Sequence, residues 1–285
     1  MMEGWIFMSE KLKVLDLFSG IGGFSLGLER TGGFETVAFC EIDPFCQKVL
    51  KKHWPCVPII EDITKIEVNQ SKRKVLNGVS TTSLTCDGKI IYDGEIDVIT
   101  GGFPCQDLSI AGRKAGLQGA RSGLWGAMFK LIGKHRPKYV IIENVANLLV
   151  GPTERPGEWF ATLLTDLASI GYDAQWHIIP ASAVGAGHHR QRAWIIAYPN
   201  QVMWTLPQKI FNQLSLQIAK RRTPSSVISL LTNFKQISIH EVYPDHRKLD
   251  GLSEAVDSLE RLGNTVVPQI PEMIGYAILE AEKIS

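Results

Sequence analysis

The 285-residue chain has no long hydrophobic run. Its longest apolar stretches, such as 139–142 and 194–198, are far shorter than the roughly 20 residues that cross a bilayer. The N-terminus also lacks the basic and then apolar pattern of a secretory signal peptide. We therefore expect a soluble, cytoplasmic protein that does not associate with a membrane.

Cysteine is scarce: there are five, an odd number, and no two are spaced as Cys-x-x-Cys. This pattern does not suggest a disulfide framework or a zinc site, and it suits a reducing compartment. We expect no bound metal. Cys40, Cys46, Cys56 and Cys86 are expected to behave as small buried hydrophobic residues.

A strong net charge is also absent, because the chain carries only +1. The charge is nevertheless uneven: between residues 201 and 250 there are seven basic and three acidic residues, a local balance of +4 against −3 elsewhere. Such a segment is either an ordinary solvated surface or a lobe that faces phosphate groups, and charge alone leaves both open.

The order of apolar segments predicts an α/β fold. With 45% hydrophobic residues, the chain can bury one large domain and still carry an insert. Strands alternate with helical spacing, so we expect a doubly wound, Rossmann-like parallel sheet. The expected strands are 14–18, 35–40, a short one ending near 62, 97–100, 139–143 and 194–197; the expected helices include 44–53 and 271–283.

Two stretches interrupt this alternation. Residues 64–95 are polar, and Asp87-Gly88 between β-prone runs predicts a small hairpin. Residues 200–257 contain three prolines, weak periodicity and the basic excess. We therefore divide the chain into a main domain (1–199), a small lobe (200–257) and a segment that completes the main domain (258–285).

Ligands of such sheets bind beyond the carboxyl ends of the strands. The glycines of Gly20-Ile21-Gly22-Gly23 follow the first strand and either cradle a cofactor or serve only a tight turn. Glu41 ends the second strand, where a carboxylate can bind ribose hydroxyls, and Asp62 ends the third, where it can bind an adenine amino group. No Lys-Ser/Thr follows the glycines, so a nucleoside without a triphosphate is favoured.

Two further strand ends carry reactive groups. Cys105 follows Gly102-Phe103-Pro104 and is a candidate nucleophile, although a cysteine is more often a buried hydrophobic residue. Glu143 ends the 139–142 strand at the same edge, as a candidate acid or as a helix cap. His188-His189 would point to opposite faces of a strand, so we reject a metal site there.

In order and spacing these motifs resemble the DNA (cytosine-5) methyltransferase family, particularly its short bacterial and phage members. Residues 16–23 are similar to its cofactor loop, 102–106 to its nucleophile loop and 143–145 to its catalytic acid motif. Residues 189–192 resemble its arginine motif, although the family more often has Gln-Arg where this chain has His188-His189, and 263–268 resemble its closing motif. Five ordered motifs are very unlikely to agree by chance.

The resemblance implies methyl transfer from S-adenosyl-L-methionine to a flipped cytosine of double-stranded DNA. The implied catalytic residues are Cys105, Glu143, Arg190 and Arg192, with the two arginines on one strand and Arg192 on the base's O2. The implied cofactor-binding residues are Phe18, Gly20, Gly22, Gly23, Glu41, Ile42, Asp62, Ile63, Pro104, Asn264 and Val266. The expected DNA contacts are Gln106, Ser109, Arg113 and Arg121, together with Lys220, Arg221 and Arg222. The first four lie in a glycine-rich, basic loop that is either a mobile lid over the base or an ordinary disordered surface loop.

Residues 200–257 occupy the position of the family's target-recognition lobe but are shorter than usual. Restriction-modification, with a cognate restriction endonuclease acting separately, and phage DNA protection both stay open. Methylation of exocyclic amines would show an Asp/Asn-Pro-Pro-Tyr/Phe motif, and the transfer-RNA branch a Cys-Phe-Thr tripeptide; the chain has neither. A binding module without catalysis is disfavoured because Cys105, Glu143 and Arg192 occur together.

Overall fold

The computed structural model describes residues 10–70, 82–104, 123–151, 155–186, 189–200 and 265–282. Their centre is a seven-stranded sheet with the order β3-β2-β1-β7-β8-β10-β9. Its strands are β1 (Leu12–Leu17), β2 (Phe34–Cys40), β3 (Ile59–Ile60), β7 (Val98–Gly101), β8 (Tyr139–Val145), β9 (Tyr172–Pro180) and β10 (Gln191–Pro199). The strand order reverses between β1 and β7, which is where a doubly wound sheet forms its ligand crevice.

The direction of one strand differs from expectation. β1, β2, β3, β7 and β8 pair in parallel, but β10 is antiparallel to both β8 and β9. The expectation of a wholly parallel sheet was therefore wrong at this edge, and the long edge strand β9 was not expected. The expected α/β fold is otherwise confirmed.

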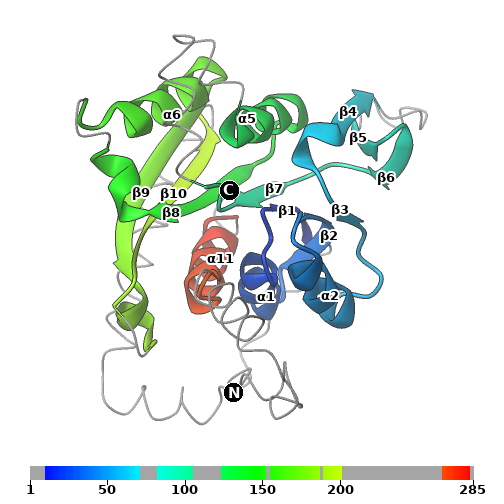
Figure 1. Ribbon diagram of the computed structural model, residues 1–285, viewed down its shortest axis with the longest axis horizontal. Helices are drawn as coiled ribbons and strands as arrows, with labels where there is room; N and C mark the ends of the chain where they lie inside the picture. Colours follow the sequence, from blue (N-terminus) through cyan, green and yellow to red (C-terminus); the bar gives the residue numbers. More distant parts are fainter. Residues whose placement is uncertain are drawn as a thin grey trace.

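Helices cover both faces of the sheet (Figure 1). On one face lie α1 (Gly23–Arg30), α2 (Pro44–His53) and α11 (Gln269–Glu282), and on the other α5 (Leu124–His135) and α6 (Glu158–Ser169). The described ranges also contain three short 3₁₀ turns: η1 (Ile63–Lys65), η3 (Ala146–Leu149) and η4 (Ala181–Val184). Within the described ranges, no helix is long and apolar enough to cross a membrane.

The bounds of α2 agree with the predicted helix because its N-terminus is well defined by local chemistry. The Asp43 carboxylate accepts hydrogen bonds from the backbone N–H groups of Phe45 and Cys46, both at 2.9 Å. Pro44 occupies the first helical position, where its missing N–H costs nothing.

The polar insert forms a separate small sheet of β4 (Ile66–Gln70), β5 (Thr82–Cys86) and β6 (Lys89–Asp93), in that order and antiparallel. Asp87 and Gly88 both have positive φ, 47° and 74°, as a tight hairpin turn requires. The predicted hairpin is confirmed, and β4 is a third strand that was not expected.

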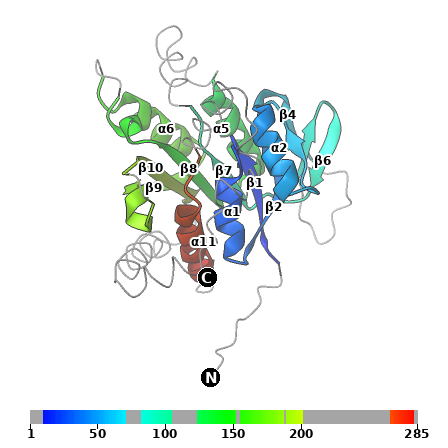
Figure 2. The ribbon, with the colours of Figure 1, turned by 60° about the horizontal axis from the view of Figure 1, so that its bottom comes forward.

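The last helix lies beside the first, although they are far apart in the chain (Figures 1 and 2). A Cβ added at Gly27 of α1 would lie 2.2 Å from the Pro268 carbonyl oxygen, and one at Gly23 would lie 2.5 Å from that of Val266. No side chain fits in such a space. Glycines in α1 therefore allow the backbone of residues 266–268 to cross this helix in direct contact.

The expectation of buried cysteines holds only in part. Cys40 and Cys46 are buried, and burial raises the pKa of the Cys40 thiol to about 12. Cys86 is half-buried, and the expectation is wrong for Cys56, which is exposed. Cys56 lies in the turn after α2, where the chain passes over the surface.

Asp16 joins three elements of the fold at the point where the strand order reverses. It is fully buried in β1, and its two carboxyl oxygens accept hydrogen bonds from Ser25 Oγ of α1 and Thr100 Oγ1 of β7, each at 2.7 Å. Burial raises the pKa of Asp16 to about 7, although both hydroxyl groups oppose this shift. The strands that lead to the glycine loop (20–23) and to residues 102–104 are thus joined through one carboxyl group.

We predict that Asp16→Asn changes the pH dependence of stability. Between about pH 4 and pH 7 the folded wild type keeps a proton on Asp16 that the unfolded chain has lost, so this group's contribution to the free energy of unfolding falls as pH rises. Urea unfolding at several pH values should show wild type losing stability relative to Asp16→Asn across this window. A difference that is constant with pH would contradict the shift.

Candidate active site

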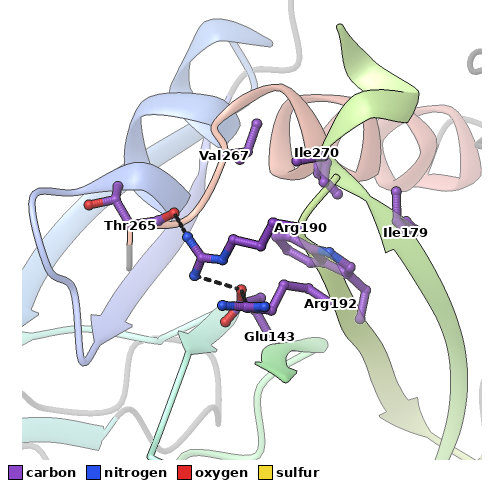
Figure 3. A pocket seen from close by; sticks show the side chains of 9 residues that line it. Glu143, Ile179, Arg190, Arg192, Thr265, Val267 and Ile270 are labelled. Carbon is purple, nitrogen blue, oxygen red and sulfur yellow. Dashed lines mark hydrogen bonds and ion pairs between the residues drawn. The ribbon is translucent and has the colours of Figure 1, made fainter. Parts of the chain in front are cut away.

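A small pocket lies at the carboxyl end of β8, between β10 and the segment before α11 (Figure 3). Its polar lining comes from Glu143, Arg190, Arg192 and Thr265. The remaining lining residues are Ile179, Ala181, Trp194, Val267 and Ile270. A carboxyl group and two guanidinium groups therefore meet in mostly apolar surroundings.

Both arginines contact the same oxygen of Glu143. Arg192 Nε lies 3.1 Å from Glu143 Oε1, and Arg190 Nη2 lies 3.7 Å from it. β10 begins at Gln191, so Arg190 precedes the strand instead of lying within it as expected. The two arginines are nevertheless two residues apart, and Figure 3 shows both side chains directed at Glu143.

The surroundings of Glu143 favour the protonated carboxyl group more than water does at an exposed glutamate. The residue is 8% exposed, and burial raises the pKa of its carboxyl group. The charges of Arg192 and Arg190 act in the opposite direction without cancelling the shift. The net direction is the one that a proton-carrying acid near neutral pH requires.

The second oxygen of Glu143 faces the loop that leads to Cys105. A Cβ added at Gly102 would lie 3.3 Å from Glu143 Oε2. The neighbouring Asn144 donates from Nδ2 to the Phe103 carbonyl oxygen at 2.9 Å. The end of β8 thus holds the backbone of 102–103 beside the acid, and the exposed Pro104 continues from there.

Glu41 organises the glycine loop. It is buried, and its two carboxylate oxygens accept hydrogen bonds from the backbone N–H groups of Gly20 (2.7 Å) and Asp43 (2.8 Å). Gly20 has a φ of +55°, and a Cβ there would meet no atom within 4 Å. Phe18 also has positive φ, 53°, which is uncommon for a residue with a side chain. The loop is therefore sharply turned and open at Gly20.

The other two glycines have packing roles. Gly22 has a φ of +90°, and a Cβ there would lie 2.7 Å from the ring of Trp54. Trp54 is held in place because its indole N–H donates to Glu29 Oε2 at 2.8 Å. Gly23, as noted for the fold, lies against the carbonyl group of Val266.

The ends of β2 and β3 offer an apolar and an acidic group. Ile42 follows Glu41 and is 76% exposed. The Asp62 carboxylate accepts hydrogen bonds from Thr64 N (2.8 Å) and Thr64 Oγ1 (2.7 Å), which lower its pKa. The Ile63 side chain is buried in the core.

These observations agree with a comparison against known families. The model of the C-5 cytosine-specific DNA methylase family matches residues 12–269. The chain belongs to this family.

Three curated relatives of this methylase family are type II methyltransferases. M2.BsuMI of Bacillus subtilis is 36% identical over 190 residues, which are 65% of this chain and 42% of the relative. M.Sau3AI of Staphylococcus aureus is 30% identical over 202 residues, which are 68% of this chain and 45% of the relative. M.AluI of Cellulosimicrobium cellulans is 36% identical over 194 residues, which are 66% of this chain and 33% of the relative. The chain thus spans less than half the length of these relatives.

Some predicted residues of this methylase lie outside the described ranges, and the structure does not test them. They are Cys105, Gln106, Ser109, Arg113, Arg121, Lys220, Arg221, Arg222 and Asn264, together with His188. His189 lies before β10, and its Nδ1 is 2.9 Å from Ser182 Oγ.

Several contacts of the site were not anticipated. The carbonyl group of Thr265 accepts a hydrogen bond from Arg190 Nη1 at 2.9 Å, and a backbone acceptor leaves no trace in residue type. Thr100 and Ser25 donate hydrogen bonds to Asp16. The sequence offers little indication of these contacts: Thr100 is a hydroxyl residue on an apolar strand, and Ser25 is one in a helix with two glycines. Asn144 could have been singled out from the sequence, because it lies within the 143–145 motif.

We predict that Arg192→Gln raises the pKa of Glu143 further, because the variant removes the nearer of the two cations that oppose the effect of burial. Carbon-13 NMR of the labelled glutamate carboxyl groups would follow the titration. Arg155→Gln is a matched control, since Arg155 contacts Glu158 on the surface and should leave Glu143 unaffected. An unchanged or lower pKa of Glu143 in Arg192→Gln would show that the contact is unimportant.

Proposed function

We propose that the protein transfers a methyl group from S-adenosyl-L-methionine to carbon-5 of a cytosine in double-stranded DNA. The observation that carries this proposal is the buried Glu143, held by two arginines and placed beside the 102–104 backbone that leads to Cys105. Family membership supports it. Because a base inside a duplex cannot reach such a pocket, the cytosine would be flipped out.

The residues around the glycine loop fit a nucleoside cofactor. Gly20 leaves open space where a side chain would stand, and the exposed Ile42 offers an apolar surface for an adenine ring. Each Glu41 oxygen accepts one backbone hydrogen bond and keeps a lone pair for a ribose hydroxyl group. Bound there with Phe18 and Asp62, S-adenosyl-L-methionine would supply the methyl group.

Gly22, Gly23, Ile63 and Val266 would act around this site mainly through packing and backbone. A side chain at Gly22 would meet Trp54, and one at Gly23 would meet the Val266 carbonyl group. The Ile63 side chain is buried in the core, and Val266 packs partly buried against it. Pro104 and Asn264 complete the proposed cofactor edge.

The chain's own residues account for the chemistry. The thiolate of Cys105 adds to carbon-6 of the cytosine, forming an S–C bond and moving an electron pair through the ring toward carbon-5 and N3. Glu143, carrying its proton, donates a hydrogen bond to N3, and Arg192 holds O2. After carbon-5 has been methylated, a base removes its proton, the carbon-5 to carbon-6 double bond returns, and Cys105 leaves as the thiolate.

The remaining proposals concern DNA. Residues 200–257 would form the lobe that chooses the target, with Lys220, Arg221 and Arg222 on phosphate groups. Gln106, Ser109, Arg113 and Arg121 would contact DNA from the loop after Cys105. A cytoplasmic role in restriction-modification, beside a separate endonuclease, follows the type II relatives, and phage DNA protection uses the same reaction.

We predict that Cys105→Ser and Cys105→Ala abolish methylation and leave duplex binding in place, since neither side chain supplies a thiolate. Wild type should form a covalent complex with duplexes that contain 5-fluorocytosine, and the variants should not. Denaturing gels and radiolabelled methyl transfer measure both. Turnover above about a hundredth of wild type in a variant would exclude covalent catalysis by Cys105.

We predict that Glu41→Ala weakens binding of S-adenosylhomocysteine roughly ten-fold or more, because the variant loses a charged acceptor and releases the Gly20 N–H. Calorimetry measures the affinity. Glu35→Ala is the matched control: Glu35 also lies on β2, but it is exposed and contacts Lys13 at 2.7 Å. Equal affinities for Glu41→Ala and wild type would remove Glu41 from the cofactor site.

A further inference from the structure

We propose that Arg190 is a positioning residue that ties the closing segment, residues 265–268, to the carboxyl group of Glu143. This inference rests on the proposed function, because it assigns Glu143 the role of the catalytic acid. In this role Arg190 differs from Arg192, although the two arginines contact the same oxygen.

The contacts of Arg190 span two parts of the chain. Its Nη1 donates to the Thr265 carbonyl oxygen at 2.9 Å, while its Nη2 lies 3.7 Å from Glu143 Oε1 (Figure 3). The planar guanidinium group holds these two nitrogens in a fixed fork, so a shift at one partner moves the other contact. The side chain is only 16% exposed, which limits its freedom to rearrange.

Among the residues that the structure describes, Arg192 makes no comparable bridge. Its Nε contacts Glu143 Oε1 at 3.1 Å, and its Nη1 donates to the carbonyl oxygen of Gln191, its neighbour in the chain. Arg192 therefore fixes the acid relative to β10, whereas Arg190 fixes it relative to the closing segment.

The closing segment is held on its other side by the first helix. The Val266 carbonyl group lies against Gly23, and the Pro268 carbonyl group against Gly27. α1 begins directly after the glycine loop. Arg190 thus completes a chain of contacts from the glycine loop, through the backbone of 265–268, to Glu143.

This arrangement has an electrostatic consequence. Burial raises the pKa of Glu143, and the charge of Arg190 opposes that rise. If the closing segment moved away, the guanidinium group would lose its backbone acceptor and its fixed distance from Oε1. Docking of residues 265–268 therefore sets both the position of the Glu143 carboxyl group and the pKa of that group. These residues follow the proposed recognition lobe in the chain.

Hydrogen exchange of the full-length chain tests the tether without requiring activity. In Arg190→Gln the backbone amides of Val266, Val267, Gln269 and Ile270 should exchange roughly ten-fold faster, because a charge-assisted hydrogen bond to this segment is lost. In Arg192→Gln, the matched variant, they should exchange as in wild type. Unchanged exchange in β1 would show that both variants are folded.

The pH dependence of methylation shows whether Arg190 acts on Glu143 or only packs beside it. The alkaline limb of single-turnover methylation should move to higher pH in Arg190→Gln, since losing the cation raises the pKa of Glu143 and preserves the protonated acid. Arg190→Lys should bring the limb back toward wild type, because it restores the charge.

The outcomes of these experiments are distinct. If the amides of Val266, Val267, Gln269 and Ile270 are unaffected in Arg190→Gln, or respond equally in Arg192→Gln, the tether is refuted. An unmoved alkaline limb refutes the link to Glu143. If wild type fails to trap 5-fluorocytosine but the exchange difference persists, the proposed function fails while the tether remains.

Discussion

The site depends on the ion contacts between a buried carboxyl group and two guanidinium groups. Burial disfavours a charged Glu143, and nearby cations reduce that cost, so the arginines allow the carboxyl group to occupy an apolar pocket. This requirement constrains the sheet. The arginines stand at the beginning of β10, whereas Glu143 stands near the end of β8. Only a strand that runs antiparallel to β8 brings its own beginning to the carboxyl edge where Glu143, Gly102 and the glycine loop lie.

This reversal also marks the limit of what the sequence could predict. Local chemistry identified α2 through Asp43 and Pro44, and the hairpin through Asp87-Gly88. Strand direction has no comparable local signal, because an apolar run has the same composition in either direction. The edge strand β9 was not predicted, and residue type is a poor guide to its burial, since the apolar Trp176 and Ile178 are exposed whereas Ile179 is buried. A parallel β10 would have placed the arginines at the opposite edge of the sheet from Glu143.

The candidate site was predicted where side-chain chemistry defines it and missed where the backbone does. Glu143, Arg192 and Glu41 carry charges at strand ends, and the structure places them at one edge. The Thr265 carbonyl group could be any residue's, so no residue type pointed to it. The sequence also could not tell which glycines lie beside open space and which are closely packed. Gly20 faces open space, whereas Gly22 packs against Trp54 and Gly23 against the Val266 backbone. The same residue type thus leaves open space at one position and allows close packing at two others.

Asp16 and Glu143 show how two buried carboxyl groups acquire different roles. Burial raises the pKa of both. Asp16 is bound by neutral hydroxyl groups from two elements, one on each oxygen, so both of its oxygens are engaged within the fold. At Glu143 both cations contact Oε1, and Oε2 faces Gly102 with no hydrogen bond from the described residues. An acid that must donate a proton to a ligand needs one oxygen outside the protein's own network. Glu143 meets this condition and Asp16 does not, so the contacts of Asp16 suit a structural role and those of Glu143 suit the acid role proposed for it.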